Sequence, residues 1–154
     1  MKDFDLNINY GIYENSQISD ALALANVIRF MAELIEKRIS LGNRQHIVNL
    51  GSGEGKTAHY LALNYGCQVT CVNNYSEQNN RNYQQAQQLG IGHLIKIFEC
   101  SFEELPLDWE QHFDIVWSQE TFYQAQNKYK VIQNSKTRGN LCFHRYYVKI
   151  TLYC

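Results

Sequence analysis

Apolar residues recur every three or four positions between residues 16 and 39, and this spacing predicts an amphipathic helix. Ser16 or Ser19 is placed to cap the start of that helix, and Gly42 follows its end. The apolar stripe consists of Ile18, Ala21, Ala25, Ile28, Ala32, Ile35 and Ile39, widened by Leu24 and Met31.

Further along the chain, short apolar runs alternate with polar stretches that suit helices. The helix expected over 56–66 ends at Gly66, and the helix expected over 77–90 is capped by Ser76 and ends at Gly90. Strands that alternate with helices favour an α/β fold, with a Rossmann-like, doubly wound and mainly parallel sheet. The apolar runs predict strands at 46–50, 68–73, 93–98 and 113–117.

A glycine-rich loop, Gly51-Ser-Gly53-Glu-Gly55, joins the first predicted strand to the first helix of this α/β region. Glycines there permit a tight turn and a close approach of backbone N–H groups to a ligand. Lys56 stands where the dinucleotide-binding pattern has its third glycine, and the spacing is too short for a phosphate-binding P-loop. The loop alone is also compatible with a plain strand–helix connection.

Asn73 ends the second predicted strand, 22 residues after Gly51. Ribose-binding α/β folds place a side chain at this position that hydrogen-bonds the ribose hydroxyls. Asparagine offers both a donor and an acceptor for that purpose. It is equally suited to end a strand, because it tolerates turn geometry.

Composition limits the class of protein. A chain of 154 residues is about one domain, and 45% hydrophobic with 19% charged residues indicates a globular protein. Its five cysteines form no C-x-x-C pair, which favours reduced thiols and argues against a zinc site. No apolar run reaches the roughly 20 residues of a membrane span, and the first residues lack a signal-peptide pattern. We therefore expect a cytoplasmic protein with no membrane partner and no metal.

Three stretches together resemble the class I S-adenosylmethionine-dependent methyltransferases: VNLGSGEGKTAHYLALNYGCQVTCVNNYSEQNNRN, SFEELP and FDIVWSQETF. Within that class the sequence is similar to the branch that methylates small amines, of the sarcosine/dimethylglycine and phosphoethanolamine type. That branch carries N-x-x-S-x-x-Q after its second strand. This sequence has a close but not identical version, in which Asn73 is followed by Ser76 and Gln78 lies five residues after Asn73. The resemblance covers about residues 8–132. It implies S-adenosylmethionine as the cofactor and methyl transfer to a small molecule, an amine nitrogen.

The resemblance also implies roles for individual residues. Gly51, Ser52 and Gly53 would pass under the methionine end of the cofactor. Asn73 and Gln78 would bind its ribose hydroxyls.

Two later segments complete this implied cofactor site. Ser101 and Phe102 would flank the adenine. Ser118 and Gln119, just past the fourth strand, would line the pocket near the reacting sulfonium. Trp117, on that strand, is better explained by core packing.

The segment INYGIY resembles the part of the family that covers the cofactor, through Tyr10, Gly11 and Tyr13. Plain packing is the alternative for both tyrosines. No catalytic base is assigned, because the histidines in this part of the chain are better explained as surface or helix residues: His59, His93 and His112.

The sequence departs from the family at two places. Asn49 stands where the family usually carries an acid that orients the amino end of the cofactor. The second departure is the end of the chain: all 15 acidic residues lie at or before Glu120, so the last 34 residues carry a formal charge of +6. We divide the chain into a cofactor-binding domain, 1–132, and a divergent basic tail, 133–154, in which YVKITLY (147–153) suits a strand.

The acid-free tail has two interpretations. It suits a nucleic-acid surface, because basic and aromatic residues alternate in it. We favour the alternative, a methyltransferase truncated or altered at its end, whose sheet is incomplete at the C-terminal strands. An open sheet edge would then favour self-association. A catalytically silent cofactor-binding remnant is the other function to weigh, and an NAD-dependent oxidoreductase is disfavoured by Lys56 and Asn73.

Overall fold

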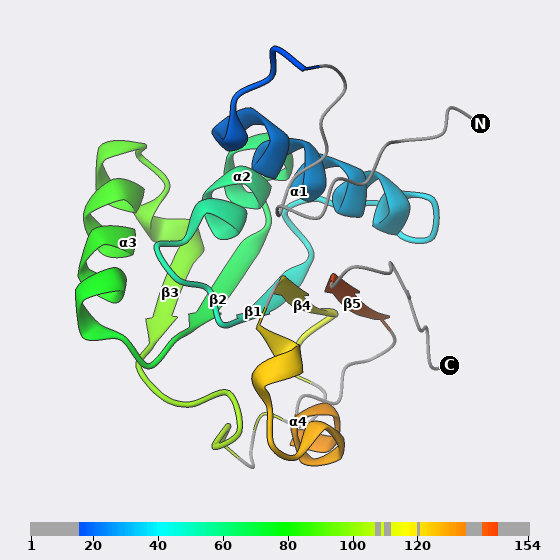
Figure 1. Ribbon diagram of the computed structural model, residues 1–154, viewed down its shortest axis with the longest axis vertical. Coiled ribbons are helices and arrows are strands. Elements are labelled where there is room, and N and C mark those ends of the chain that lie inside the picture. The colour runs from blue at the N-terminus through cyan, green and yellow to red at the C-terminus, as the bar shows by residue number, and fades with distance from the viewer. Residues whose placement is uncertain (1–15, 107–108, 110–111, 120, 135–139, 145–154) are drawn as a thin grey trace. The chain divides into compact units, whose positions relative to one another are not determined.

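The computed structural model describes residues 16–106, 109, 112–119, 121–134 and 140–144. The chain divides into two compact units, residues 1–40 and 41–154. The second unit contains all the strands that the structure describes (Figure 1). Its elements are β1 (His46–Leu50), α2 (Lys56–Tyr65), β2 (Gln68–Val72), α3 (Ser76–Gln88), η1 (Gly92–Leu94), β3 (Ile95–Phe98), β4 (Ile115–Gln119), η3 (Phe122–Gln124), α4 (Lys128–Asn134) and β5 (Asn140–His144).

The first unit contains one described helix, α1 (Asp20–Glu36). Of the two candidate caps, Ser19 is the one used, and its Oγ accepts a hydrogen bond from the Leu22 N–H at 3.4 Å. The helix ends at Glu36, so Gly42 lies too far along the chain to cap it. The buried face matches the predicted stripe only in part, because Ala21 of that stripe is exposed and the polar residue Asn26 is buried. The buried residues are Ala23, Asn26, Val27, Ile28, Met31, Ala32 and Ile35.

The five strands form one parallel sheet in the order β3-β2-β1-β4-β5. The predicted doubly wound α/β fold is therefore confirmed. Val48 and Leu50 of β1 pack in one core cluster with Val131 of α4, so α4 covers that face. α2 and α4 lie on opposite sides of the strands in Figure 1. Such double covering explains why the central strands are continuous apolar runs rather than alternating ones.

The predicted elements shift slightly at their ends. β3 begins at Ile95 because the three residues before it form a 3-10 turn. β4 runs two residues later than expected, over Ile115–Gln119, and Phe113 instead packs in the core. Ser76 is the first residue of α3 rather than its cap, since its hydroxyl is hydrogen-bonded to Glu99. The Gly66 stop of α2 is confirmed, with φ +71°.

The fifth strand comes from a segment that the sequence pattern did not single out. β5 pairs in parallel with β4, from Ile115 opposite Asn140 to Gln119 opposite His144. The edge beside β4 is therefore not open, and the strand that covers it is not 147–153, the segment of the tail in which a strand was expected. Residues 147–153 themselves lie outside the described part of the chain.

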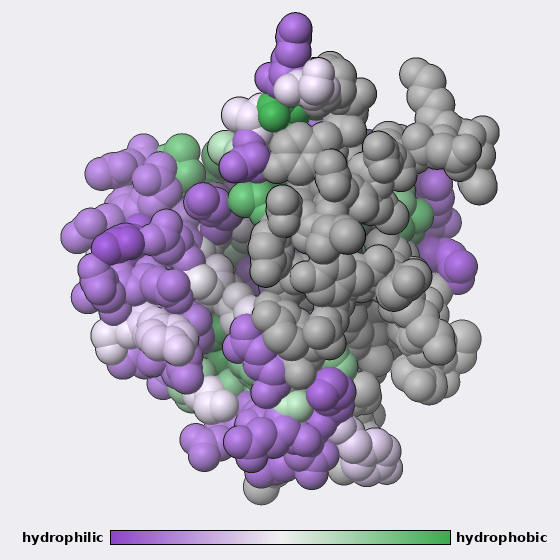
Figure 2. Space-filling model, in the orientation of Figure 1, coloured by the Kyte–Doolittle hydropathy of each residue, from purple (hydrophilic) through white to green (hydrophobic). Residues whose placement is uncertain are grey.

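The surface over α3 is mainly hydrophilic (Figure 2), as its run of glutamines and asparagines requires. Trp117, in contrast, is fully buried in β4, which confirms its core role. Among the described residues, no helix is long and apolar enough to cross a membrane.

Candidate cofactor site at the carboxyl ends of the strands

The sheet order places a topological switch point between β1 and β4. The chain leaves β1 for α2 and leaves β4 for α4, and these helices lie on opposite sides of the sheet (Figure 1). The connections therefore diverge at the carboxyl ends of these two strands. Open α/β sheets bind ligands in the crevice that such a divergence creates. The predicted site residues at the ends of β1, β2 and β4 all belong to this edge. Ser118 and Gln119, which were expected just past the fourth strand, are the last two residues of β4.

The three glycines of the loop after β1 serve different purposes. All have positive φ: +69° at Gly51, +53° at Gly53 and +83° at Gly55. A Cβ on Gly51 would lie 2.5 Å from the Thr121 side chain, and one on Gly55 would collide with Asn82. Among the described residues, a Cβ on Gly53 would meet only Gln78 Oε1, at 4.0 Å. Two glycines are thus required by internal packing, and of the three only Gly53 leaves space between the described residues that a ligand can use.

The amides of the loop divide in the same way. Gly51 N–H and Ser52 N–H both donate to the Val72 carbonyl, at 2.8 and 3.1 Å, which ties the loop to β2. In the described part of the chain, no partner is found for the N–H of Gly53 or Glu54. These two amides precede the amino end of α2, where backbone donors favour polar or anionic ligand groups.

Beneath the loop lies the buried thiol of Cys71. Burial raises its pKa to about 11, and the polar side chains of Asn82 and Ser52 beside it oppose this rise only partly. The Ser52 hydroxyl is buried and has no hydrogen-bond partner among the described residues. The thiol therefore stays protonated at neutral pH and serves as packing rather than as a nucleophile.

The predicted ribose-binding pair meets at the end of β2. Asn73 is buried, and its Nδ2 donates to Gln78 Oε1 at 3.1 Å, to Asn79 Oδ1 at 3.2 Å and to the Tyr75 carbonyl at 3.4 Å. Its Oδ1 accepts no hydrogen bond from a described residue. Gln78 uses its oxygen toward Asn73, which leaves its Nε2 as a donor. Asn73 and Gln78 therefore present one acceptor and one donor beside Gly53.

Two residues of this cluster were not predicted. Asn79, buried in the first turn of α3, donates to the Asn73 carbonyl and to Glu99, each at 3.0 Å. Glu99 also accepts from the Ser76 hydroxyl at 2.6 Å, and these two hydrogen bonds lower the pKa of its carboxyl group. The only sequence signal for Asn79 was its place next to Gln78. Glu99 gave none, because an acid after a strand is common.

The end of β4 is arranged differently. The Ser118 hydroxyl is buried, 3.3 Å from the Leu50 carbonyl and 2.9 Å from the Thr121 hydroxyl. Thr121 itself donates to the Leu50 carbonyl at 2.9 Å. Gln119 accepts from Thr57 at 3.3 Å, which joins β4 to the start of α2. Both predicted pocket residues thus bond to the scaffold, and Thr121, which the sequence did not reveal, links them to the glycine loop.

The predicted adenine-flanking residues follow β3. The Ser101 hydroxyl accepts from the Glu103 N–H at 3.2 Å, which closes a tight turn. Phe102 is partly buried against the core cluster of β1, β2 and β4. The two residues lie beyond the carboxyl end of β3, the strand next to the one that Asn73 ends. Tyr10, Gly11 and Tyr13 lie outside the described residues.

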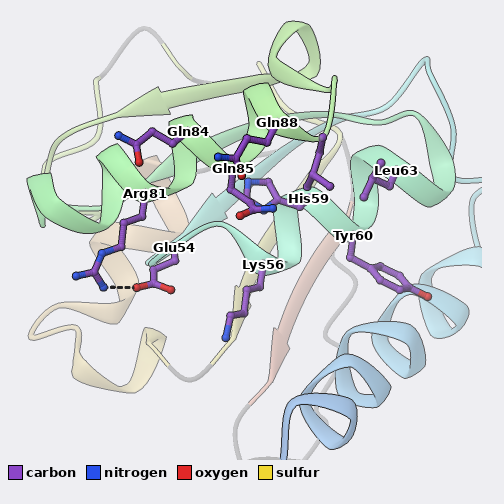
Figure 3. Close-up of a pocket in the computed structure, with 10 residues that line it drawn as sticks. Glu54, Lys56, His59, Tyr60, Leu63, Arg81, Gln84, Gln85 and Gln88 are labelled. Atoms are coloured by element: carbon purple, nitrogen blue, oxygen red, sulfur yellow. Dashed lines mark hydrogen bonds and ion pairs between the residues drawn. The ribbon is translucent and has the colours of Figure 1, made fainter.

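A separate groove of about 550 Å³ runs between α2 and α3 (Figure 3). Arg81 spans it to form an ion pair with Glu54 at 2.7 Å. His59, on α2, is buried and bonds Asn82 of α3 at 2.8 Å, which joins the two helices. None of the residues that line this groove is among the predicted cofactor contacts.

Comparison with known proteins agrees with this architecture. A family model described as a methyltransferase domain matches residues 48–137. The chain therefore belongs to the methyltransferase domain family. More narrowly, it is a domain of the class I S-adenosylmethionine-dependent methyltransferases, which confirms the resemblance seen in the sequence.

The similar proteins include enzymes that methylate small amines. The chain is 33% identical to the glycine/sarcosine/dimethylglycine N-methyltransferase of Actinopolyspora halophila, covering 89% of this chain and 24% of that protein. It is 31% identical to the sarcosine/dimethylglycine N-methyltransferase of Halorhodospira halochloris, covering 84% of this chain and 45% of the other. The chain thus spans half or less of the length of these relatives.

Solved structures give the same fold. A crystal structure from Galdieria sulphuraria, assigned to the sarcosine dimethylglycine methyltransferases, superposes with a TM-score of 0.81 at 25% identity, over 89% of this chain and 52% of that one. The geranyl diphosphate C-methyltransferase of Streptomyces coelicolor, solved with S-adenosyl-L-homocysteine, superposes with a TM-score of 0.72 at 14% identity, over 87% of this chain and 55% of that one. At that low identity the second likeness concerns the fold alone.

Proposed function

We propose that this domain binds S-adenosylmethionine at the carboxyl ends of β1 and β2, and that the protein transfers its methyl group to a small amine. The observation that carries the proposal is the cluster of Gly53, Asn73 and Gln78. A glycine with open space above its Cα lies beside two carboxamides that leave an oxygen and a nitrogen uncommitted.

This cluster fits the ribose of the cofactor chemically. A vicinal diol has two hydroxyls, each of which can donate and accept a hydrogen bond. The Asn73 oxygen matches one hydroxyl as an acceptor, and the Gln78 nitrogen matches the other as a donor. Gly53 lets the backbone approach the ligand closely, and the neighbouring amides offer further donors. The set therefore suits a neutral, hydroxyl-bearing ligand.

The chemistry demands little from the side chains of this domain. The bound cofactor supplies a methyl group already activated on a sulfonium. The residues of the chain hold that group and the acceptor nitrogen in line, and such positioning is worth several kcal/mol. An amine must present a neutral lone pair to react, so its proton must leave first. No described residue is assigned as the base for that step.

A small amine is favoured as the acceptor because the relatives reported above are named for glycine, sarcosine and dimethylglycine. Those proteins are at least twice as long as the matched part, so the acceptor is part of the proposal. The second candidate is cofactor binding without turnover. It is favoured by the end of β4, where Ser118 and Gln119 bond to the scaffold instead of being presented to an acceptor.

A methyl-transfer assay tests the proposal. The purified protein would be incubated with S-adenosylmethionine carrying a labelled methyl group and, in turn, with sarcosine, dimethylglycine and phosphoethanolamine. Label on an amine, reduced in Asn73→Ala when the cofactor is limiting, supports methyl transfer at this site. Binding of S-adenosylmethionine with no labelled product supports the silent domain. If the protein neither binds S-adenosylmethionine nor forms labelled product, both candidates are overturned.

A further inference from the structure

A polar relay connects the end of β3 to the end of β2. It begins at Glu99, whose carboxylate accepts from the Asn79 side-chain nitrogen at 3.0 Å. The same nitrogen donates to the Asn73 carbonyl at 3.0 Å. The Asn79 oxygen then accepts from the Asn73 side-chain nitrogen at 3.2 Å. Asn79 is only 5% exposed and Asn73 only 6%, so water cannot easily replace the bonds between these two residues, whereas Glu99 itself is exposed.

These hydrogen bonds fix the orientation of the Asn79 and Asn73 carboxamides. Either group could otherwise turn over and exchange the places of its oxygen and its nitrogen. A carboxylate and a backbone carbonyl only accept hydrogen bonds, so the atom of Asn79 that faces Glu99 and the Asn73 carbonyl must be nitrogen. The Asn79 oxygen must then face Asn73, which turns the Asn73 nitrogen inward. The Asn73 oxygen is consequently the atom left for a ligand.

Such a device is needed because this position holds asparagine. Aspartate, the usual residue at a ribose-binding strand end, has two equivalent oxygens and presents an acceptor whichever way it turns. Asparagine can present either an acceptor or a donor. Asn73 carries no charge of its own. The carboxylate that orients it belongs to Glu99 and works through the Asn79 side chain.

We propose that Glu99 and Asn79 are positioning residues, which orient Asn73 so that its carboxamide oxygen faces the ribose of the cofactor. This inference rests on the proposed function, because it assumes that the ribose binds at Asn73. Neither residue needs to touch the ligand.

Calorimetry with S-adenosylhomocysteine measures the effect. In Glu99→Gln, an amide that can donate replaces one of the two obligatory acceptors of the Asn79 nitrogen, the other being the Asn73 carbonyl. The hydrogen bonds that hold the Asn79 and Asn73 carboxamides in one orientation are thereby weakened. We expect the affinity to fall about three- to tenfold, the scale of one charge-assisted hydrogen bond. Glu77→Gln is the matched control, since it removes the same charge from an exposed position on α3 and should leave the affinity unchanged.

Two further measurements separate orientation from general damage. The 2′,3′-dideoxy analogue of S-adenosylhomocysteine lacks the hydroxyls, so Glu99→Gln should not weaken its binding. In an Asn73→Asp background the residue presents oxygen in either orientation. Glu99→Gln should then cause no further loss of affinity for S-adenosylhomocysteine.

The outcomes are distinguishable. If the unmodified protein does not bind S-adenosylhomocysteine, the proposed function and the inference both fail. If it binds but Glu99→Gln behaves like Glu77→Gln, the inference alone fails. An equal loss for the dideoxy analogue, or an undiminished effect in the Asn73→Asp background, would also overturn it.

Discussion

The ends of β2 and β4 carry polar residues that the sequence placed in the same cofactor site, yet their hydrogen bonds differ. At β2, Asn73 directs its nitrogen into the protein and keeps its oxygen uncommitted among the described residues. At β4, the Ser118 and Thr121 hydroxyls face each other and share the Leu50 carbonyl. The first arrangement leaves a group for a ligand. The second uses its groups to hold the glycine loop.

This difference shows that position at a strand end does not by itself define a contact residue. Buried polar groups are nearly always hydrogen-bonded, so the informative question is which atoms remain without a partner. By that criterion we propose that the residues at the end of β2 bind the ligand and that those at the end of β4 support the glycine loop. Substitutions should therefore change ligand affinity on one side and folding stability on the other.

The largest expected effect is on Gly53. In Gly53→Val the side chain fills the space next to Gln78, so affinity for S-adenosylhomocysteine should fall at least about a hundredfold. Gly90→Val is the matched control. Gly90 has a similarly positive φ, +71°, and no atom within 4 Å of an added Cβ, so it imposes similar backbone strain away from the site. Equal affinities in the two variants would show that the loop is only structural.

A substitution at Gly51 should lower folding stability rather than ligand affinity, because an added Cβ there meets the Thr121 side chain. In Gly51→Ala the new Cβ meets Thr121 and the backbone keeps φ +69°, so unfolding should become easier by about 2–4 kcal/mol. The double variant Gly51→Ala/Thr121→Gly removes the collision and should be more stable than the sum of the two single changes predicts. Chemical denaturation measures all three. Strict additivity would contradict the packing explanation.

The direct comparison uses Asn73→Ala and Ser118→Ala. We expect Asn73→Ala to weaken S-adenosylhomocysteine binding about tenfold, the loss of one hydrogen-bonding group to the ligand. Ser118→Ala should cost about 1 kcal/mol of folding stability, because it removes a buried hydrogen bond, and should leave the affinity within about twofold. If Asn73→Ala instead lowered folding stability and Ser118→Ala lowered the affinity, the roles that we give to the two strand ends would have to be exchanged.

The smallest expected effect is a pH dependence far from the site. At the start of β1, burial lowers the pKa of His46, His112 and Lys96 lower it further, and Asp114 opposes them. The folded state thus disfavours protonation of His46. The contribution of neutral His46 to folding stability should be fully present above the usual histidine pKa of about 6.5. It should be lost as the pH falls below that value and through the lower pKa that His46 has in the folded protein.

Thermal unfolding between about pH 7.5 and pH 5.5 checks this sign. The acid-induced fall in melting temperature should shrink in His46→Gln. It should persist in His93→Gln, because His93 is exposed. An unchanged fall in His46→Gln would assign the acid sensitivity to other groups.

Much of the fold was predictable because its central strands are continuous apolar runs and because glycines follow the ends of α2 and α3. The glycine loop and Asn73 marked the candidate site because residue type and short sequence spacing define both of them. β5 was missed because Asn140–His144 is short and lacks a strong strand pattern, while its parallel pairing with β4 is a long-range contact. Asn79, Glu99 and Thr121 were missed because their importance lies in which atoms they face, and sequence spacing carries no such information.

Competitive calorimetry of S-adenosylhomocysteine and NAD on the unmodified protein tests the central claim most directly. Our account predicts that S-adenosylhomocysteine binds more tightly, because Lys56 replaces the third glycine of the dinucleotide pattern and Asn73 with Gln78 suits the ribose of the methyltransferase cofactor. Tighter binding of NAD, or no binding of S-adenosylhomocysteine, would contradict it.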